Sequence, residues 1–155
     1  MWKRMLIPTD GSDLSNQSIE AGVQLAKVLG ARVVGFFAAP APTPIIYSSF
    51  LPVGYGSPED HARLIEETAV KYLSVVENAA GKAGVEYELV HVTNDFPAEA
   101  IVDMAQEKAC DVIFIASHGR RGRRGPILGS ETQKVASQAA IPVVIFRNEA
   151  AATQP

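Results

Sequence analysis

The chain has few of the residues that build disulfides and metal sites. Its 155 residues include one cysteine, Cys110, so an intrachain disulfide is excluded. A lone cysteine fits a reducing compartment, and we interpret Cys110 as a small packing residue rather than a redox group. The three histidines, His61, His91 and His118, lack the spacing of metal ligands, so we expect no metal site.

Long apolar runs and a strong excess of charge are also missing. No stretch approaches the roughly 20 apolar residues that cross a bilayer. The start, MWKRMLIPTDGS, is broken too soon by polar residues to be a signal peptide. We therefore expect a cytoplasmic protein with no membrane partner. The formal net charge of −3 argues against nucleic acid as a partner.

The sequence does contain a regular alternation of short apolar segments and helical patterns. The apolar segments predict strands at residues 5–8, 32–38, 85–92, 111–116 and 142–147. The helical patterns lie at residues 15–29, 59–82, from Pro97 onward, and 130–139. Such alternation predicts parallel strands joined by right-handed crossovers. Two loops that look like binding loops follow the first and fourth strands, and they would meet in a strand order of 3-2-1-4-5.

We therefore predict an α/β fold, in which a five-stranded parallel sheet carries helices on both faces. We expect one domain at residues 1–148 and a flexible tail at 149–155. Ser15 is the expected cap of the first helix, Gly30 its stop, and Leu64 part of the buried stripe of the longest helix. Residues 39–58 contain five prolines, which favours a long loop. This loop is either a lid or partner surface, or an insertion with no binding role.

Residues 111–130, DVIFIASHGRRGRRGPILGS, have the pattern of an anion site. A buried strand is followed by a glycine-rich loop and then by the start of a helix. Glycines allow backbone N–H groups to approach a phosphate, and the unpaired N–H groups at a helix N-terminus point toward it. Four arginines in the loop add charge and fork-shaped donors: Arg120, Arg121, Arg123 and Arg124. The pattern indicates a phosphorylated small molecule as the ligand.

The same residues carry a resemblance to the universal stress protein family. In its nucleotide-binding branch, Gly-x-x-Gly, nine residues and Gly-Ser/Thr follow the fourth strand. This chain has residues 116–119, Ala-Ser-His-Gly, then nine residues, then Gly129-Ser130. Ala116 is the single departure, since the pattern has glycine there. The family's aspartate after the first strand corresponds to Asp10.

The resemblance implies a Rossmann-like fold that binds an adenine nucleotide: ATP, or AMP or ADP, with Mg²⁺ able to accompany it. Asp10 would bind the ribose, in a loop shaped by Pro8 and Thr9, and the backbone near Ala38 would meet the adenine. The remaining candidate residues would line the ribose and phosphates: Ala116, Ser117, His118, Gly119, Arg120, Gly129, Ser130 and the amide of Glu131. The family also often forms dimers, which here implies pairing through residues 142–147.

Several of these residues have a plainer alternative role. Asp10 is suited to cap a turn with Ser12, and Ser130 to cap a helix. The arginines are a solvated loop, an RNA contact or a phosphate clamp, and we favour one or two at phosphate. No nucleophile or second base accompanies His118, and the chain lacks a Walker lysine, so hydrolysis of ATP would be slow at most.

Three functions follow from these alternatives. The first is a stress-response protein that binds ATP or another adenine nucleotide as a regulatory ligand. The second is an interaction module of the same fold whose nucleotide site is degenerate, with Ala116 as the sign of that loss. The third is a slow ATP-hydrolysing enzyme that uses the arginines and His118.

Overall fold

A computed structural model describes residues 1–41, 58–119 and 126–148 of the chain. The arginine cluster, the predicted tail and most of the proline-rich loop lie outside these ranges. Five strands are present: β1 (Arg4–Pro8), β2 (Arg32–Ala39), β3 (Tyr87–Thr93), β4 (Val112–Ala116) and β5 (Val143–Phe146). Four helices alternate with them: α1 (Asp13–Leu29), α2 (Pro58–Ala83), α3 (Pro97–Glu107) and α4 (Ser130–Gln138).

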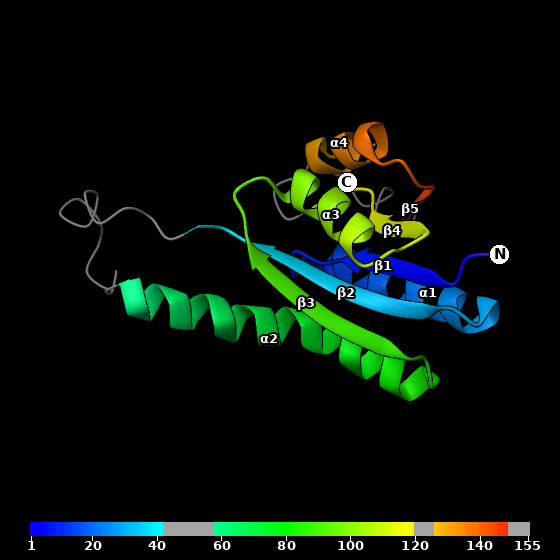
Figure 1. Cartoon of the computed structure of the whole chain (residues 1–155), viewed down its shortest axis with the longest axis horizontal. Helices are drawn as coiled ribbons and strands as arrows, with labels where there is room; N and C mark the ends of the chain where they lie inside the picture. The colour runs from blue at the N-terminus through cyan, green and yellow to red at the C-terminus, as the bar shows by residue number, and fades with distance from the viewer. Residues whose placement is uncertain (42–57, 120–125, 149–155) are drawn as a thin grey trace, which may run out of the picture.

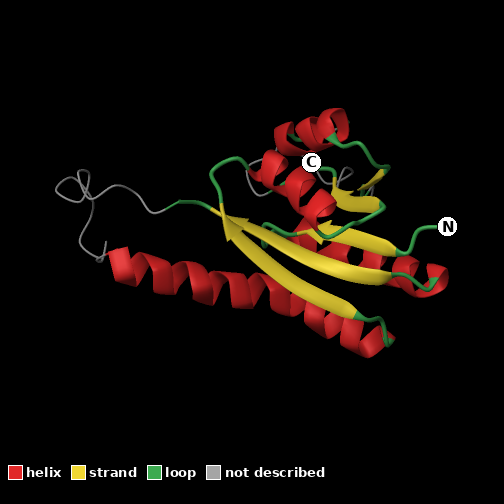
Figure 2. Cartoon of the chain, in the orientation of Figure 1, coloured by secondary structure: helices red, strands yellow, loops and turns green. Residues whose placement is uncertain are grey.

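The strands form one parallel sheet in the order β3-β2-β1-β4-β5, as the sequence predicts (Figure 2). β1 lies at the centre, where Leu6 is paired with Val34 of β2 on one side and with Ile113 of β4 on the other. The strand order reverses at β1. The loops that follow β1 and β4 therefore leave the sheet side by side at its carboxyl edge.

Helices cover both faces of the sheet (Figure 1). One buried cluster joins α1 and α2 to the sheet and includes Ile19, Val23 and Val76. A second cluster joins α3 and α4 to the opposite face and includes Ile101 and Val135. With apolar layers on both sides, the central strands are buried along nearly their whole length, which explains their continuous apolar sequence.

The first helix begins earlier than its expected cap. Ser12, in extended conformation, is the N-cap of α1, and its side chain accepts a hydrogen bond from Ser15 N at 3.2 Å. Ser15 is instead buried inside the first turn, so the prediction of Ser15 as the cap was wrong. The predicted stop is confirmed, because Gly30 has a φ of 65° in the left-handed region.

The longest helix also differs from its predicted buried stripe. Leu64 is 59% exposed, and the buried positions begin at Ala69 and continue with Leu73 and Val76. The first turns of α2 extend past the carboxyl ends of the strands (Figure 1). At this level of the helix the adjacent Ile65 packs against the buried cluster that contains Phe37, whereas Leu64 stays exposed. Among the described residues, no helix has the length and apolar character to cross a membrane.

Cys110 lies between α3 and β4 and is 6% exposed. Burial, the largest cause, raises the pKa of its thiol from 9.0 to about 11. Because the folded-state pKa is raised, the contribution of the neutral thiol to stability is complete below the unfolded pKa. It is lost as pH rises through the interval between the two values.

We therefore expect the free energy of unfolding of the wild type to fall more steeply above pH 9 than that of Cys110→Ala. The extra loss should be about 1 kcal/mol by about pH 10, since one pKa unit corresponds to about 1.4 kcal/mol. Urea unfolding of both proteins between about pH 8 and about pH 10 measures it. Identical pH slopes would contradict the assignment of Cys110 as a buried neutral thiol.

Candidate functional site

The two loops predicted to meet are in contact at the carboxyl edge of the sheet. Asp10 belongs to the turn between β1 and α1, and Gly119 to the segment after β4. A Cβ placed on Gly119 would lie 2.5 Å from Asp10 Oδ2. The carboxylate therefore rests against the backbone of Gly119, and any larger residue there would displace it. The described structure thus joins the two halves of the predicted site at this contact.

The turn that carries Asp10 is held by a local network of hydrogen bonds. Thr9 N donates to Phe36 O at 2.8 Å, which fixes the end of β1 against β2. Thr9 Oγ1 accepts from Gly11 N and from Ser15 Oγ, both at 3.1 Å. These bonds set the backbone of the turn before any ligand arrives.

Asp10 itself takes part in this turn. Ser12 N donates to Asp10 Oδ1 at 3.0 Å, so the turn-capping role considered for Asp10 is present in the structure. The two carboxylate oxygens are therefore directed differently, with Oδ1 toward Ser12 and Oδ2 toward Gly119. The side chain is partly buried. A carboxylate held in this way is oriented before a ligand binds, which reduces the entropy lost on binding.

The end of β4 is tied to the start of α4. Ser117 O accepts from Gly129 N at 2.8 Å, and Ser117 N donates to Phe146 O of β5 at 2.8 Å. Thr132 Oγ1 of α4 donates to Ala116 O at 2.8 Å. The N-terminus of α4 is thereby held at the carboxyl end of β4. Thr132 was missed by the sequence analysis, because a threonine inside a helix shows no local sign of such a partner.

The N-terminus of α4 differs in detail from its prediction. Gly129 is the N-cap, with φ −58° and ψ 152°, and as a glycine it provides no side-chain cap. Ser130 is the first helical residue and is exposed, so the alternative role of Ser130 as the helix cap is not the one in the structure. The first backbone N–H groups of α4 therefore have no side-chain cap among the described residues, as an anion site requires.

The side chain of Glu131 is turned toward a neighbouring helix. Its Oε2 accepts from Ala98 N at 3.0 Å, at the N-terminus of α3, and its Oε1 accepts from Lys134 Nζ at 3.2 Å. Phe96, the N-cap of α3, provides no side-chain hydrogen bond. Glu131 supplies the missing acceptor from another helix. The sequence signal was the lack of a polar cap at Phe96, although it could not identify the partner.

His118 is packed into the site rather than presented to solvent. Its exposed fraction is 7%, and its Nδ1 lies 3.1 Å from Ser117 Oγ. The hydrogen bond between these neighbouring side chains fixes the ring. Among the described residues, no group of three or more histidine, cysteine, aspartate or glutamate side chains could hold a metal ion.

The remaining candidate residues lie at the same edge or outside the described ranges. Pro8, the last residue of β1, is paired with Phe36, and Ala38 follows two residues later in β2. Ala38 is paired with Val92 of β3. Arg120 lies outside the described residues. The structure thus places Pro8 and Ala38 at the carboxyl edge that also carries Asp10 and Gly119.

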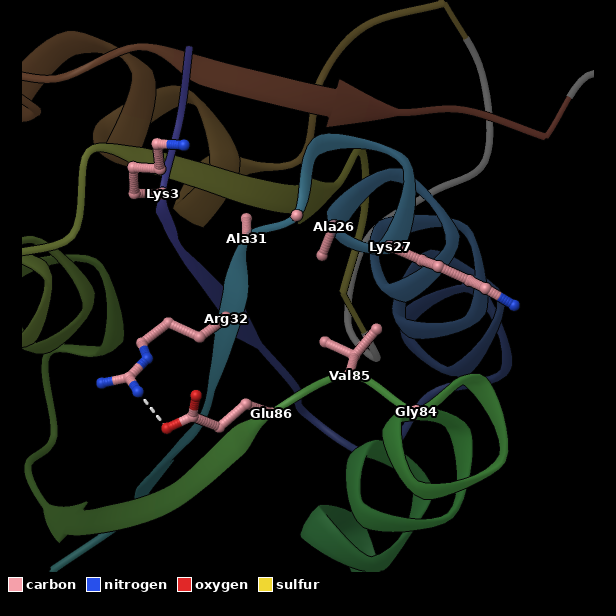
Figure 3. Close-up of a pocket in the computed structure, with 9 residues that line it drawn as sticks. Lys3, Ala26, Lys27, Ala31, Arg32, Gly84, Val85 and Glu86 are labelled. Atoms are coloured by element: carbon pink, nitrogen blue, oxygen red, sulfur yellow. Dashed lines mark hydrogen bonds and ion pairs between the residues drawn. The ribbon is translucent and has the colours of Figure 1, made fainter.

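A cavity of about 250 Å³ lies at the opposite, amino edge of the sheet (Figure 3). It is lined by Lys3 and Lys27 together with an Arg32–Glu86 ion pair. The hydrogen bond from Arg32, followed by its charge, lowers the pKa of Glu86. Gly30, which has no side chain to fill it, also lines the cavity. This cavity shares no residue with the candidate site.

The chain resembles known proteins over nearly its whole length. A family model described as the universal stress protein family matches residues 1–147. The chain belongs to the universal stress protein family. The universal stress protein YxiE of Bacillus subtilis is 32% identical over 154 residues, which cover 95% of this chain and 100% of the relative. The predicted family is therefore confirmed.

Solved structures show the same universal stress protein fold. The structure of the hypothetical protein MJ0577 has a TM-score of 0.78 at 21% identity, covering 96% of this chain and 97% of that chain. A universal stress protein in complex with cAMP has a TM-score of 0.68 at 22% identity, covering 94% and 97%.

Two further structures of the family are named with a nucleotide. A universal stress protein from Archaeoglobus fulgidus in complex with dAMP has a TM-score of 0.63 at 22% identity, covering 94% of this chain and 98% of that chain. A family member from Arabidopsis thaliana with AMP bound has a TM-score of 0.67 at 16% identity, covering 98% and 95%. At these identities the likeness establishes the fold.

Proposed function

We propose that this universal stress protein binds an adenine nucleotide, with ATP as the expected ligand, between the β1–α1 turn and the segment that joins β4 to α4. The contact between the Asp10 carboxylate and Gly119 carries the proposal, because it joins the two sequence motifs in one place. Relatives with the same fold are named as complexes with cAMP, dAMP and AMP. These three ligands share an adenine, a sugar and a phosphate.

The parts of the nucleotide are assigned by chemistry. Asp10 accepts hydrogen bonds from the ribose hydroxyls, because a carboxylate would repel the phosphates. The phosphates lie at the N-terminus of α4, against the backbone of Gly129, Ser130 and Glu131. The adenine lies at the backbone near Ala38. The residues that complete the lining are Pro8, Thr9, Ala116, Ser117, His118, Gly119 and Arg120.

The geometry of Ala116 favours a working site over a degenerate one. Ala116 is the last residue of β4 and is paired with Phe146 of β5. Among the described residues, Ala109 is the only non-glycine residue with a positive φ. Ala116 therefore does not use the backbone freedom for which glycine is needed. Its methyl group is compatible with the strand, and the departure from the family pattern does not distort this backbone.

We propose a regulatory role for the nucleotide in a cytoplasmic protein formed by one domain at residues 1–148. Mg²⁺ would arrive with ATP, coordinated by the phosphates. His118 is buried and hydrogen-bonded to Ser117, which favours a positioning role over catalysis. A second chain would pair through β5, which lies at an edge of the sheet. Adenine-nucleotide binding defines the function. The bound nucleotide would act by changing the conformation of the protein or its choice of partner.

The test of this function is the loss of affinity on replacing Asp10. We expect Asp10→Ala to weaken ATP binding about fivefold, because the ribose loses a charged acceptor. Isothermal titration calorimetry measures the affinity. Denaturing the wild type directly after purification should also release an adenine nucleotide, which mass spectrometry would detect.

The matched control is Asp13→Ala. Asp13 is also acidic and lies in the first turn of α1, but it is exposed. Asp13→Ala removes the same charge as Asp10→Ala, three residues farther along the chain. A general electrostatic effect on ATP binding would therefore appear in both variants. Because Asp10 also accepts from Ser12 N, melting of the ligand-free proteins is needed as well. A fall in melting temperature without any change in affinity would leave Asp10 with its turn-capping role alone.

A further inference from the structure

One aromatic side chain of α2 lies against the candidate site without belonging to either sequence motif. A Cβ placed on Gly11 would overlap the ring of Tyr72. Gly11 has a φ of +77°, in the region that favours glycine. The backbone of the turn therefore presses directly on the Tyr72 ring, and glycine is needed at position 11 for both reasons.

The same ring makes a second contact, with β2. Tyr72 and Phe37 form an edge-to-face pair with centroids 5.1 Å apart and planes at 78°. Tyr72 also packs on a small buried cluster made of Phe37, Ala39, Ala69 and Leu73. An edge-to-face pair of this kind has a preferred geometry and resists sliding. The cluster therefore fixes Tyr72 at the carboxyl end of β2.

These two contacts involve the sequence neighbours of two proposed ligand-binding positions. Gly11 directly follows Asp10, which is assigned to the ribose. Phe37 directly precedes Ala38, which is assigned to the adenine. We infer that Tyr72 is a positioning residue for the nucleoside half of the ligand, an inference that rests on the proposed function. It holds the Asp10 turn and the end of β2 at a fixed separation, without touching the nucleotide.

The geometry also separates this role from phosphate binding. The predicted phosphate-binding backbone lies at Gly129, which is held by Ser117 across the β4–α4 side of the site. Tyr72 contacts the β1–α1 turn and β2 instead. A change at Tyr72 should therefore weaken binding by the same factor whether the ligand carries one phosphate or three. This signature differs from that of a variant at the α4 N-terminus.

The experiment compares Tyr72→Leu with two controls. Tyr72→Phe keeps the ring against Gly11. Val76→Ala, one turn farther along α2, removes fully buried volume that packs against Gly35 of β2. We expect Tyr72→Leu to bind AMP and ATP about threefold more weakly, the scale of one misaligned hydrogen bond. Val76→Ala should bind within about twofold of the wild type, and Tyr72→Phe should lose less affinity than Tyr72→Leu because it keeps the ring.

A second measurement follows the turn itself. In the ligand-free protein, amide hydrogen exchange at Gly11 and Ser12 should be faster in Tyr72→Leu than in Val76→Ala. Wild-type affinity in Tyr72→Leu, or an equal loss in Val76→Ala, would overturn the positioning role and leave the proposed function intact. A wild type that binds neither AMP nor ATP would instead remove the proposed function, and the positioning role with it.

Discussion

Replacing Gly129 with valine is expected to lower the affinity for ATP at least tenfold, which corresponds to about 1.4 kcal/mol or more. Gly129 is the N-cap of α4. A Cβ there would lie 3.2 Å from His118 Cα and 3.3 Å from Ser117 O, both backbone atoms. The branched side chain would have to push the two backbone segments apart or occupy the approach to the α4 N–H groups. In either case the phosphates could no longer reach the N–H donors of α4.

The size of the side chain and the number of phosphates provide the controls. Gly129→Ala adds only the methyl that makes these close contacts, so its loss should be smaller than that of valine. The loss in Gly129→Val should be larger for ATP than for AMP, in contrast to the equal factors expected at Tyr72. Because the Ser117–Gly129 hydrogen bond also supports the fold, calorimetry must use conditions in which the variant is fully folded. Unchanged affinity in that folded protein would remove the phosphate site from α4.

Much of the fold could be predicted because its signals are local. Gly30 marks the end of α1 and Pro97 the start of α3, and the buried apolar segments mark β1, β2 and β4. The strand order was predicted from the switch-point rule, which places the two binding loops side by side. The observed order β3-β2-β1-β4-β5 confirms it. The failures have tertiary causes. Ser12 and Ser15 are both suitable caps by residue type, and Leu64 and Ile65 are both apolar although only Ile65 packs against the buried cluster.

The candidate site could be proposed from the sequence where its residues belong to a contiguous motif. Asp10, Gly119 and Gly129 stand in recognisable patterns, and the structure brings Asp10 to Gly119. Tyr72 and the carboxylate of Glu131 could not be found in this way. Glu131 caps a helix that begins more than thirty residues earlier in the chain, and Tyr72 reaches the turn from the middle of a helix whose placement depends on tertiary packing.

The second large effect is expected at the edge of the sheet formed by β5. Pro142 O and Phe146 O accept hydrogen bonds from Ile113 N and Ser117 N on the β4 side. Because the N–H and C=O groups of successive residues in a strand point to opposite sides, Val144 also faces β4, whereas Ile145 presents its backbone to the outer edge. Proline at Val144 would therefore break the sheet of one chain. Proline at Ile145 would remove an outward donor and leave the pairing of β4 with β5 in place.

We therefore expect the wild type to sediment as a dimer paired antiparallel through β5. The dissociation constant of the Ile145→Pro dimer should be about a hundredfold higher, because the two-fold axis makes each lost hydrogen bond occur twice. Ile145→Lys is the companion that leaves the backbone donor in place. Ile145 is partly buried against the α3–α4 cluster, so a lysine there tests whether the remaining exposed side chain touches the partner. A dimer in Ile145→Lys with a monomer in Ile145→Pro would mean that backbone pairing dominates the contact. A wild type that remains monomeric in sedimentation at high micromolar concentration would exclude the dimer, and the edge of β5 would then need another partner.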